Sequence, residues 1–542
     1  MGRIEYVILI VNGSDLMKKC ELVVLQTSDI HGNILPINYG NNKQTNSGLA
    51  KLATVFKNIL KTSNCTILID NGDVIQGTPF MYHFAKHMNE LSNPVVSVMN
   101  DLGYDGAVIG NHEFNFGQSL LNNAIRESNF PWLSANIVIK QTKEPAFGKP
   151  YFIKTFPNGL RIAVLGVTTH YIPNWENPDN ILGLEFLDAF ETLNMWVEYL
   201  QKNEQYDLLI VSYHGGFERD LETGDPTEQL TGENQAYRIC MEIAGIDVLL
   251  TGHQHRQLST QLNDVLVAQP GHMGQAFSKV SIKLEKLNGS WTIVENASDI
   301  IAIDENTEPD GKIVELASLY EDSTQDWLDE PLGEIVGDMR VHSPLEVRKK
   351  DHPLIEFINK IQMDAAGVDI SATALFHNGA PGFPNKVTMR DIVSNYVYPN
   401  TLKVITVSGQ DIKDALEKSA EYFILNDDGE IQVNPSFESP KPQHYNYDMW
   451  EGIEYHLDIS KPLGNRVTLL KYKGEKLKLT DPFNIVVNNY RAGGGGNFIM
   501  YRGKQVKKEI QTDMTELIAN YIQRHRKIVA SCNDNWSVLP LK

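Results

Sequence analysis

The feature that most constrains this chain is a short pattern that recurs along its first half. In five places an apolar run ends at a histidine, aspartate or asparagine that lies beside or near a glycine. The polar residues at these five ends are Asp29, Asp73, Asn111, His214 and His253. Short apolar runs bounded by turn residues are typical of buried strands. Stretches with helical spacing, at 49–60 and 189–200, lie between some of them. The alternation predicts a layered α/β domain whose polar strand ends gather at one edge of its sheets.

These strand ends carry only oxygen and nitrogen donors. Asp29 and His31 are separated by one residue, so in an extended segment both side chains would point to the same side and reach one cation. Asp73 is the preferred acid of its loop because a carboxylate can bridge two ions and Gly72 allows close approach. The full set of candidate ligands is Asp29, His31, Asp73, Asn111, His214, His253 and His255. This set suits a pair of Mn, Fe, Co or Zn ions better than copper or a thiolate cluster.

Composition narrows the class of protein. A chain of 542 residues exceeds what one hydrophobic core usually supports, so two or three domains are expected. The formal net charge of -20 argues against a nucleic-acid polymer as a partner, because that binding needs clustered Lys and Arg. The four cysteines are scattered, which predicts free thiols. We recognise no signal peptide and no membrane-spanning run, and therefore expect a cytoplasmic protein without a membrane partner.

The ordered motifs SDIHGN, NGDVIQG, GNHEFNFG, SYHGG and TGHQH resemble those of the calcineurin-like metallophosphoesterases, in the branch that carries a second, nucleotide-binding domain. The resemblance covers essentially the whole chain. It implies a site for two metal ions that Asp73 bridges. One ion would be held by Asp29, His31 and His255, and the other by Asn111, His214 and His253. It also implies that His112 is a catalytic imidazole at the transferring phosphoryl group and binds no metal.

The second half has its own polar and aromatic loops. HNGAP, YVYPNT, YNYDMWEGIEYHLD and NNYRAGGGGNF are similar to the 5'-nucleotidase C-terminal domain, and more closely to its 2',3'-cyclic-nucleotide 2'-phosphodiesterase/3'-nucleotidase members. By residue type alone, aromatics near loops are more often packed hydrophobes than a stacking platform. The resemblance implies instead that Tyr398 and Tyr490 sandwich the base of a nucleotide. Further candidates for substrate contacts are Asn378, Asn400, Arg491 and the stretch from Asn446 to Asp448.

Two departures from the 5'-nucleotidase pattern favour the cyclic-phosphodiesterase branch. That family often has an arginine after NG, whereas this chain has Ala380-Pro381-Gly382. It also commonly has GNHEFD, in which the aspartate orients the catalytic histidine, and here Asn115 takes that position. An amide cannot stabilise an imidazolium as a carboxylate does, so we expect His112 to be less readily protonated. Asn115 is thus a second candidate catalytic residue.

The sequence predicts a metallophosphoesterase domain of β-sheets flanked by helices at 17–305, a helical linker at 306–330 and a smaller α+β nucleotide-recognition domain at 331–542. The predicted function is a metal-dependent hydrolase of nucleotide phosphoesters, namely a 2',3'-cyclic-nucleotide 2'-phosphodiesterase with 3'-nucleotidase activity. The first alternative is a 5'-nucleotidase or UDP-sugar hydrolase. The second is a non-catalytic nucleotide-binding protein, which would be expected to have lost ligands.

Overall fold

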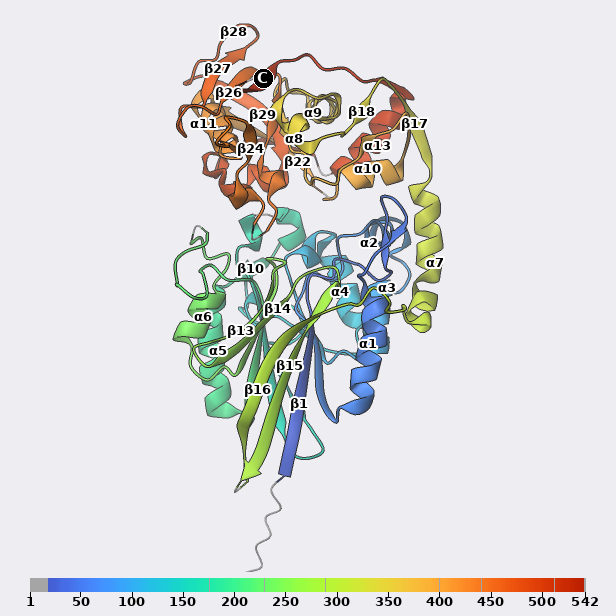
Figure 1. Ribbon diagram of the computed structural model, residues 1–542, viewed down its shortest axis with the longest axis vertical. Helices are drawn as coiled ribbons and strands as arrows, with labels where there is room; N and C mark the ends of the chain where they lie inside the picture. Colours follow the sequence, from blue (N-terminus) through green and yellow to red (C-terminus); the bar gives the residue numbers. More distant parts are fainter. Residues whose placement is uncertain are drawn as a thin grey trace, which may run out of the picture.

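The computed structural model describes residues 18–540 except 175, 229, 288, 399, 440 and 511. Met17, where the first domain is predicted to begin, lies outside the described residues, as do the stretch before it and residues 541 and 542 at the predicted end of the second domain. Figure 1 shows two lobes along the long axis of the molecule, with helix α7 (Gly311–Leu328) running along one side between them.

Two six-stranded sheets form the centre of the N-terminal lobe. The order of the first is β16 (Ser290–Ala302), β15 (Ala276–Leu287), β1 (Lys18–Thr27), β4 (Cys65–Asp70), β5 (Gly106–Val108) and β6 (Trp132–Leu133). The order of the second is β13 (Gln257–Leu262), β14 (Val265–Pro270), β12 (Val248–Thr251), β11 (Leu208–His214), β9 (Arg161–Thr168) and β8 (Tyr151–Thr155).

Alternating side chains of the strands explain the four layers of this lobe. In β1, Leu22 and Val24 belong to the core between the two sheets, whereas Val23 and Leu25 pack in the core beneath the helices. Because both faces are covered, the central parallel strands β4, β11 and β12 are buried along their whole length. Figure 1 shows the covering helices on either side, namely α1 (Leu49–Thr62) and α3 (Pro94–Leu102) on the first sheet and α5 (Ala189–Asn203) and α6 (Ala236–Glu242) on the second. The predicted layered α/β domain is confirmed.

Parallel pairing determines where the strand ends lie. β1 is parallel to β4, β4 to β5, and β11 to both β9 and β12. The carboxyl ends of parallel strands meet at one edge of a sheet, so the loops that follow β1, β4, β5, β11 and β12 come together. That edge faces the C-terminal lobe (Figure 1).

The C-terminal lobe mixes strands and helices, as predicted for an α+β domain. Its five-stranded sheet has the order β25 (Met449–Glu451), β19 (Ser371–Thr373), β29 (Pro482–Asn488), β22 (Leu402–Ser408) and β30 (Val506–Ile510). A second sheet has the order β28 (Glu475–Lys476), β27 (Val467–Tyr472), β26 (Glu454–Asp458) and β32 (Trp536–Leu539). The longer helices are α9 (Pro353–Ala366), α11 (Gly409–Ala420) and α13 (Met514–His525).

Helix α7 occupies most of the predicted linker. It follows β16 and precedes β17 (Pro331–Val336), and it packs on α1 and α3 in one lobe and α10 (Met389–Asn395) in the other. Arg390 of α10 ties the lobes further, because its guanidinium donates to Tyr39 O at 2.7 Å and to Gln325 Oε1 of α7 at 2.7 Å. None of the described helices combines the length and the apolar character needed to cross a membrane.

Candidate active site

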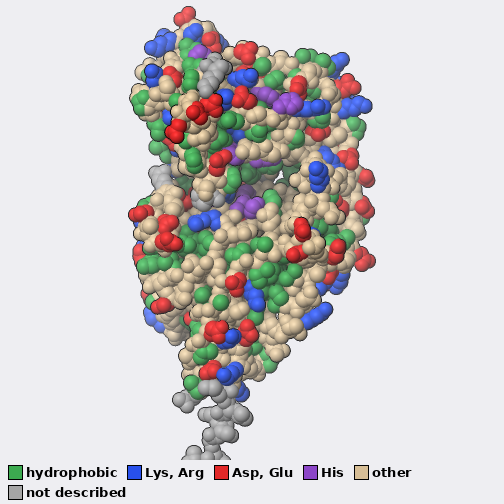
Figure 2. All heavy atoms as spheres, viewed as in Figure 1, with side chains coloured by type: hydrophobic (Ala, Val, Ile, Leu, Met, Phe, Trp, Pro, Cys, Tyr) green, Lys and Arg blue, Asp and Glu red, His purple; other side chains and the backbone are tan. Residues whose placement is uncertain are grey.

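Six of the seven predicted ligands fall into two groups at the edge of the N-terminal lobe. Asp29, His31 and His255 offer ligand atoms within 4.8 Å of one another, and Asp73, His214 and His253 form a second such group. The seventh, Asn111, joins the second group, because its Oδ1 lies 3.1 Å from His214 Nε2 and 2.9 Å from His253 Nδ1. Figure 2 shows histidine side chains at the border of a hollow between the lobes.

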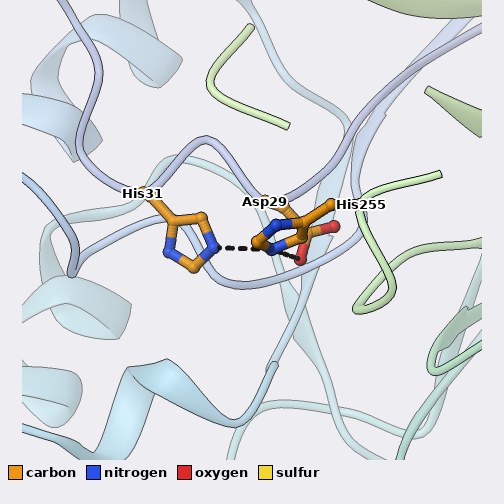
Figure 3. Close-up of side chains that lie close together, drawn as sticks. All are labelled: Asp29, His31 and His255. Atoms are coloured by element: carbon orange, nitrogen blue, oxygen red, sulfur yellow. Dashed lines mark hydrogen bonds and ion pairs between the residues drawn. The ribbon is translucent and has the colours of Figure 1, made fainter. Parts of the chain in front are cut away.

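The first group has the donor set of a cation site. Figure 3 shows its three side chains, in which His255 Nε2 lies 3.1 Å from His31 Nε2 and 3.4 Å from Asp29 Oδ1. His31 Nδ1 donates to Gln76 O at 3.0 Å, so the Nε2 atom of a neutral His31 carries a lone pair. Two nitrogens and a carboxylate oxygen that face one another this closely fit a shared divalent ion.

The second group repeats this arrangement. His214 Nδ1 donates to Asn71 O at 2.7 Å, which leaves Nε2 facing Asp73 Oδ2 at 3.1 Å. Burial lowers the pKa of His214, but the negative charges of Asp73 and Asp29 outweigh it and raise this pKa to about 10. The group therefore attracts positive charge strongly, as a metal site must.

The backbone around the ligands is unusual. Five of them, namely Asp29, His31, Asp73, His253 and His255, have φ between 49° and 66°. Left-handed backbone costs free energy in residues other than glycine and is concentrated at functional sites. The extended segment expected to carry Asp29 and His31 is not found, because β1 ends at Thr27. Their side chains converge instead because Asp29 N donates to Gly72 O at 2.9 Å and His31 N donates to Asp73 O at 2.8 Å.

Close packing behind the ligands requires glycine. A Cβ on Gly110 would lie 2.3 Å from Asp73 Oδ1, and one on Gly252 would lie 2.2 Å from Ser28 Oγ. Either would displace a ligand or its support. The buried carboxylate of Glu113 holds the same loops together, because it accepts from Asp73 N at 2.9 Å and Gly110 N at 2.6 Å. Sequence reasoning missed this residue, since one acid in a turn is usually solvated.

His112 lies at the edge of the ligand groups, with its ring centroid 5.2 Å from that of His31. Its Nδ1 donates to Asn115 Oδ1 at 2.6 Å, and Asn115 Nδ2 donates to Glu176 Oε2 at 2.7 Å. Burial raises the pKa of the Glu176 carboxyl. The sequence carries no signal for Glu176, because it lies in an irregular loop outside the motifs.

Charged residues from both lobes complete the site. Glu233 Oε1 accepts from His253 Nε2 at 3.0 Å, and such outer partners fix the orientation of a ligating ring. Lys441 reaches over from the C-terminal lobe and donates to His253 O at 3.1 Å. Lys441 and Arg502 both line the cavity between the lobes, where they supply positive charge in an acidic protein. None of the three was predicted, because charged loop residues are common.

A cavity of about 330 Å³ lies between the lobes. Its walls include Asn111, His112, Asn115 and His253 from the N-terminal lobe and Tyr398, Asn400, Tyr445, Asn446 and Tyr490 from the C-terminal lobe. Both predicted stacking rings, Tyr398 and Tyr490, thus face the same space as the second ligand group. The volume is within the range typical of sites for small ligands.

The ring of Tyr445 makes an edge contact with each of the two predicted stacking residues. Its ring centroid is 6.2 Å from that of Tyr398 and 6.2 Å from that of Tyr490, with interplanar angles of 77° and 76°. We call these three residues the tyrosine slot. Sequence reasoning named the neighbouring stretch from Asn446 onward but missed Tyr445, since nothing in a single sequence distinguishes it from Tyr447, which is buried.

Four residues of the predicted substrate set do not line the cavity, namely Asn378, Tyr447, Asp448 and Arg491. Asn378 Oδ1 accepts from Arg348 Nη1 at 2.8 Å, and its Nδ2 lies 3.0 Å from His444 Nε2. Arg491 is 2% exposed and donates to the carboxylate of Asp448 at 2.7 and 3.1 Å. The side chains of Asn378 and Arg491 are engaged by other protein groups, so the geometry favours a supporting role for each behind the cavity wall.

Two family models match the chain. Calcineurin-like phosphoesterase matches residues 22–257, and 5'-nucleotidase, C-terminal domain matches residues 333–503. The chain is 26% identical to the 2',3'-cyclic-nucleotide 2'-phosphodiesterase/3'-nucleotidase of Yersinia enterocolitica, over 96% of this chain and 88% of that protein. It is 27% identical to the trifunctional nucleotide phosphoesterase protein YfkN of Bacillus subtilis over 96% of this chain, which spans 39% of that relative.

Among solved structures, a Staphylococcus aureus protein with a provisional 5'-nucleotidase name is 34% identical and superimposes with a TM-score of 0.88. The similarity covers 96% of this chain and 99% of that one. All seven candidate ligands lie within the first matched segment and the tyrosine slot within the second. The chain therefore belongs to the calcineurin-like phosphoesterases that carry a 5'-nucleotidase C-terminal domain.

Proposed function

We propose that this protein hydrolyses nucleotide phosphoesters with two divalent metal ions, and that 2',3'-cyclic nucleotides and 3'-nucleotides are its main substrates. One observation carries the proposal: Asn111 and His253 of the second ligand group line a single cavity together with His112 and the tyrosine slot. A phosphoester bound near the ligands could therefore place its base between aromatic rings.

The two ligand groups assign the metals. Asp29, His31 and His255 would hold one ion, and Asn111, His214 and His253 would hold the other. Asp73 would be a ligand of both ions. When bound, such ions lower the pKa of water and neutralise the charge of phosphoryl oxygens. The mixed carboxylate, amide and imidazole donors suit Mn, Fe, Co or Zn.

His112 would assist the departure of the ribose oxygen. Its Nδ1 is occupied by Asn115, so Nε2 is the atom available to the substrate. A protonated His112 would donate from Nε2 to the leaving oxygen as its bond to phosphorus breaks. With a cyclic diester the ring would open to a 3'-phosphate, and a second hydrolysis would release nucleoside and phosphate.

The C-terminal lobe would recognise the nucleoside. Stacking between Tyr398 and Tyr490 tolerates any base, because every base has a π-face. Asn400 and Asn446, which also line the cavity, would supply polar contacts to base or sugar. Lys441 and Arg502 would attract the anionic substrate despite the net charge of -20.

A 5'-nucleotidase or UDP-sugar hydrolase is the second candidate. The provisional name of the Staphylococcus aureus structure favours it. The absence of an arginine after Gly379 argues against it, since Ala380 and Pro381 follow instead.

The test is an assay of hydrolysis. The protein is first stripped of metal with a chelator and then reconstituted separately with Mn, Co or Zn. The substrates in the assay are 2',3'-cyclic AMP, 3'-AMP, 5'-AMP and UDP-glucose. We expect the highest kcat/KM with the cyclic diester and the 3'-monoester. Asp73→Asn should be inactive on all four, which excludes a contaminating phosphatase. A clear preference for 5'-AMP or UDP-glucose would replace the first candidate with the second, and binding without turnover would indicate a non-catalytic protein.

A further inference from the structure

A third group of acidic side chains lies in the C-terminal lobe, away from the cavity. Asp351 precedes α9, Glu356 lies in its first turn, and Glu451 ends β25. One carboxylate oxygen of each lies within 4.8 Å of the others. All three residues are buried, with exposed fractions of 5%, 1% and 2%. We call them the carboxylate cluster.

The segment that leads into β32 covers the cluster and satisfies part of it. Asp351 Oδ2 accepts from the backbone N atoms of Asn533 and Asp534 at 3.1 and 3.0 Å. Glu451 Oε2 accepts from Asn533 Nδ2 at 3.0 Å and from Asn535 Nδ2 at 3.3 Å. These amides therefore occupy one oxygen of each of two carboxylates.

The remaining oxygens have no such partner. Asp351 Oδ1, Glu356 Oε2 and Glu451 Oε1 are buried and accept no hydrogen bond from any residue that the structure describes. Lys360 Nζ pairs with Glu356 Oε1, so one ammonium offsets one of three carboxylates. If all three carboxylates are ionised, two negative charges remain uncompensated in a buried site.

Such a site needs protons or a cation. Burial and the charge of Asp351 raise the pKa of Glu451 to about 8. Burial and the charge of Glu356 also raise the pKa of Asp351. Both shifts reflect how unfavourable it is to ionise neighbouring carboxylates in a buried place.

We propose that the carboxylate cluster binds one structural calcium ion, distinct from the catalytic metals. The free donors are all oxygens, which hard cations prefer, and the residual charge of two matches a divalent ion. Asn535 Oδ1 is another buried oxygen without a hydrogen-bond donor among the described residues, and it adjoins Glu451 through the Nδ2 contact. The ion joins α9 and β25 to the segment before β32, and so fastens the last strand to the lobe. This site is independent of the proposed substrate.

Luminescence of terbium, which substitutes for calcium, detects the site directly. Trp450 precedes Glu451 and Trp536 follows Asn535, and both indoles are buried. The experiment uses the full-length Asp29→Asn/Asp73→Asn variant, which weakens metal binding by the catalytic ligand groups. Bound metal is removed with a chelator, and the protein is then titrated with Tb³⁺. We expect tryptophan-sensitised emission that Ca²⁺ competes away.

Matched variants in the same background locate the ion. Glu451→Gln removes one cluster charge, whereas Glu454→Gln makes the same change at a half-buried residue three positions along, paired with Lys471. Equilibrium dialysis should show one Ca²⁺ per chain lost in Glu451→Gln and none lost in Glu454→Gln. Equal binding by both variants, or emission unchanged in Glu451→Gln, would overturn the proposal in favour of carboxyls that share protons.

Thermal stability gives a second test, because the difference in Tm between Glu451→Gln and its parent should change sign when Ca²⁺ is added. In excess chelator above pH 8, where the Glu451 carboxyl is ionised, Glu451→Gln should melt at a higher temperature than its parent, because the substitution relieves repulsion between carboxylates. In Ca²⁺ the parent should melt higher, because it alone gains binding free energy. The same order of Tm under both conditions contradicts calcium binding. Glu356→Gln, which retains an oxygen for Lys360, serves if Glu451→Gln does not fold.

Discussion

Asn115 Oδ1 lies 2.6 Å from Nδ1 of His112, and the other end of the same amide donates to the Glu176 carboxylate at 2.7 Å. A carboxylate oxygen only accepts, so Glu176 fixes which way the amide faces. The amide oxygen then holds a proton on His112 Nδ1. A carboxylate therefore still lies behind the catalytic imidazole in this chain, one residue further away than in the GNHEFD pattern.

Glu176→Ala should lower kcat by about 10- to 100-fold and leave KM nearly unchanged, because the amide of Asn115 is then free to turn. Glu176→Gln retains an oxygen that accepts from Asn115 Nδ2 and should recover most of the activity. Steady-state kinetics of both variants test this role. Wild-type kcat in Glu176→Ala would mean that Asn115 is oriented without it.

His112→Ala should reduce turnover by about 10² to 10⁴, the usual contribution of a positioned acid or base. Its metal content should not change, because His112 belongs to neither ligand group. Elemental analysis and kcat are measured on the same preparation. If turnover stays at the wild-type level while the metal content is unchanged, the proposed role of His112 is wrong.

Tyr490→Ala should weaken nucleotide binding by about 1–3 kcal/mol, the value of stacking one base on an aromatic ring. Tyr490→Phe retains the ring and should bind nearly as well as the wild type. The control substrate is a small phenyl phosphodiester that lacks a base, whose KM should respond much less. An equal loss on both substrates would assign Tyr490 a structural role.

Arg491→Ala should destabilise the C-terminal lobe by about 3–5 kcal/mol, because it leaves the buried Asp448 carboxylate without its partner. The guanidinium also lies over Phe498, with its carbon 3.9 Å from the ring centroid. Denaturant unfolding measures the effect. Unchanged stability together with weaker nucleotide binding would instead restore the substrate contact predicted from the sequence.

The metal ligands could be predicted because strand ends leave a strong local signal. At Gly72-Asp73 and Gly252-His253 an apolar run ends at a glycine followed by a residue that can bind a metal. This pattern predicts both a buried strand and a metal ligand at the end of that strand. Five such endings are predicted to gather at one side of the domain, because the carboxyl ends of parallel strands meet at one edge of each sheet. The layered fold and the ligand groups follow from the same pattern.

Residues that act through tertiary contacts left no such signal. Glu176 and Lys441 lie in loops, and their roles depend on how the chain brings Asn115 and His253 to them. The expected extended segment at Asp29 failed for a similar reason. Hydrogen bonds to the loop after β4 favour a left-handed conformation that local propensity opposes.

Each of the two ligand groups should hold one divalent ion, and Asp73 should contact both ions. Anomalous diffraction at the manganese edge from crystals of the reconstituted protein tests it most directly. We expect two peaks about 3.5–4 Å apart, one beside His31 and His255 and one beside His214 and His253, with Asp73 contacting both. A single peak, or no peak in crystals of protein that remains active after chelation, would contradict it.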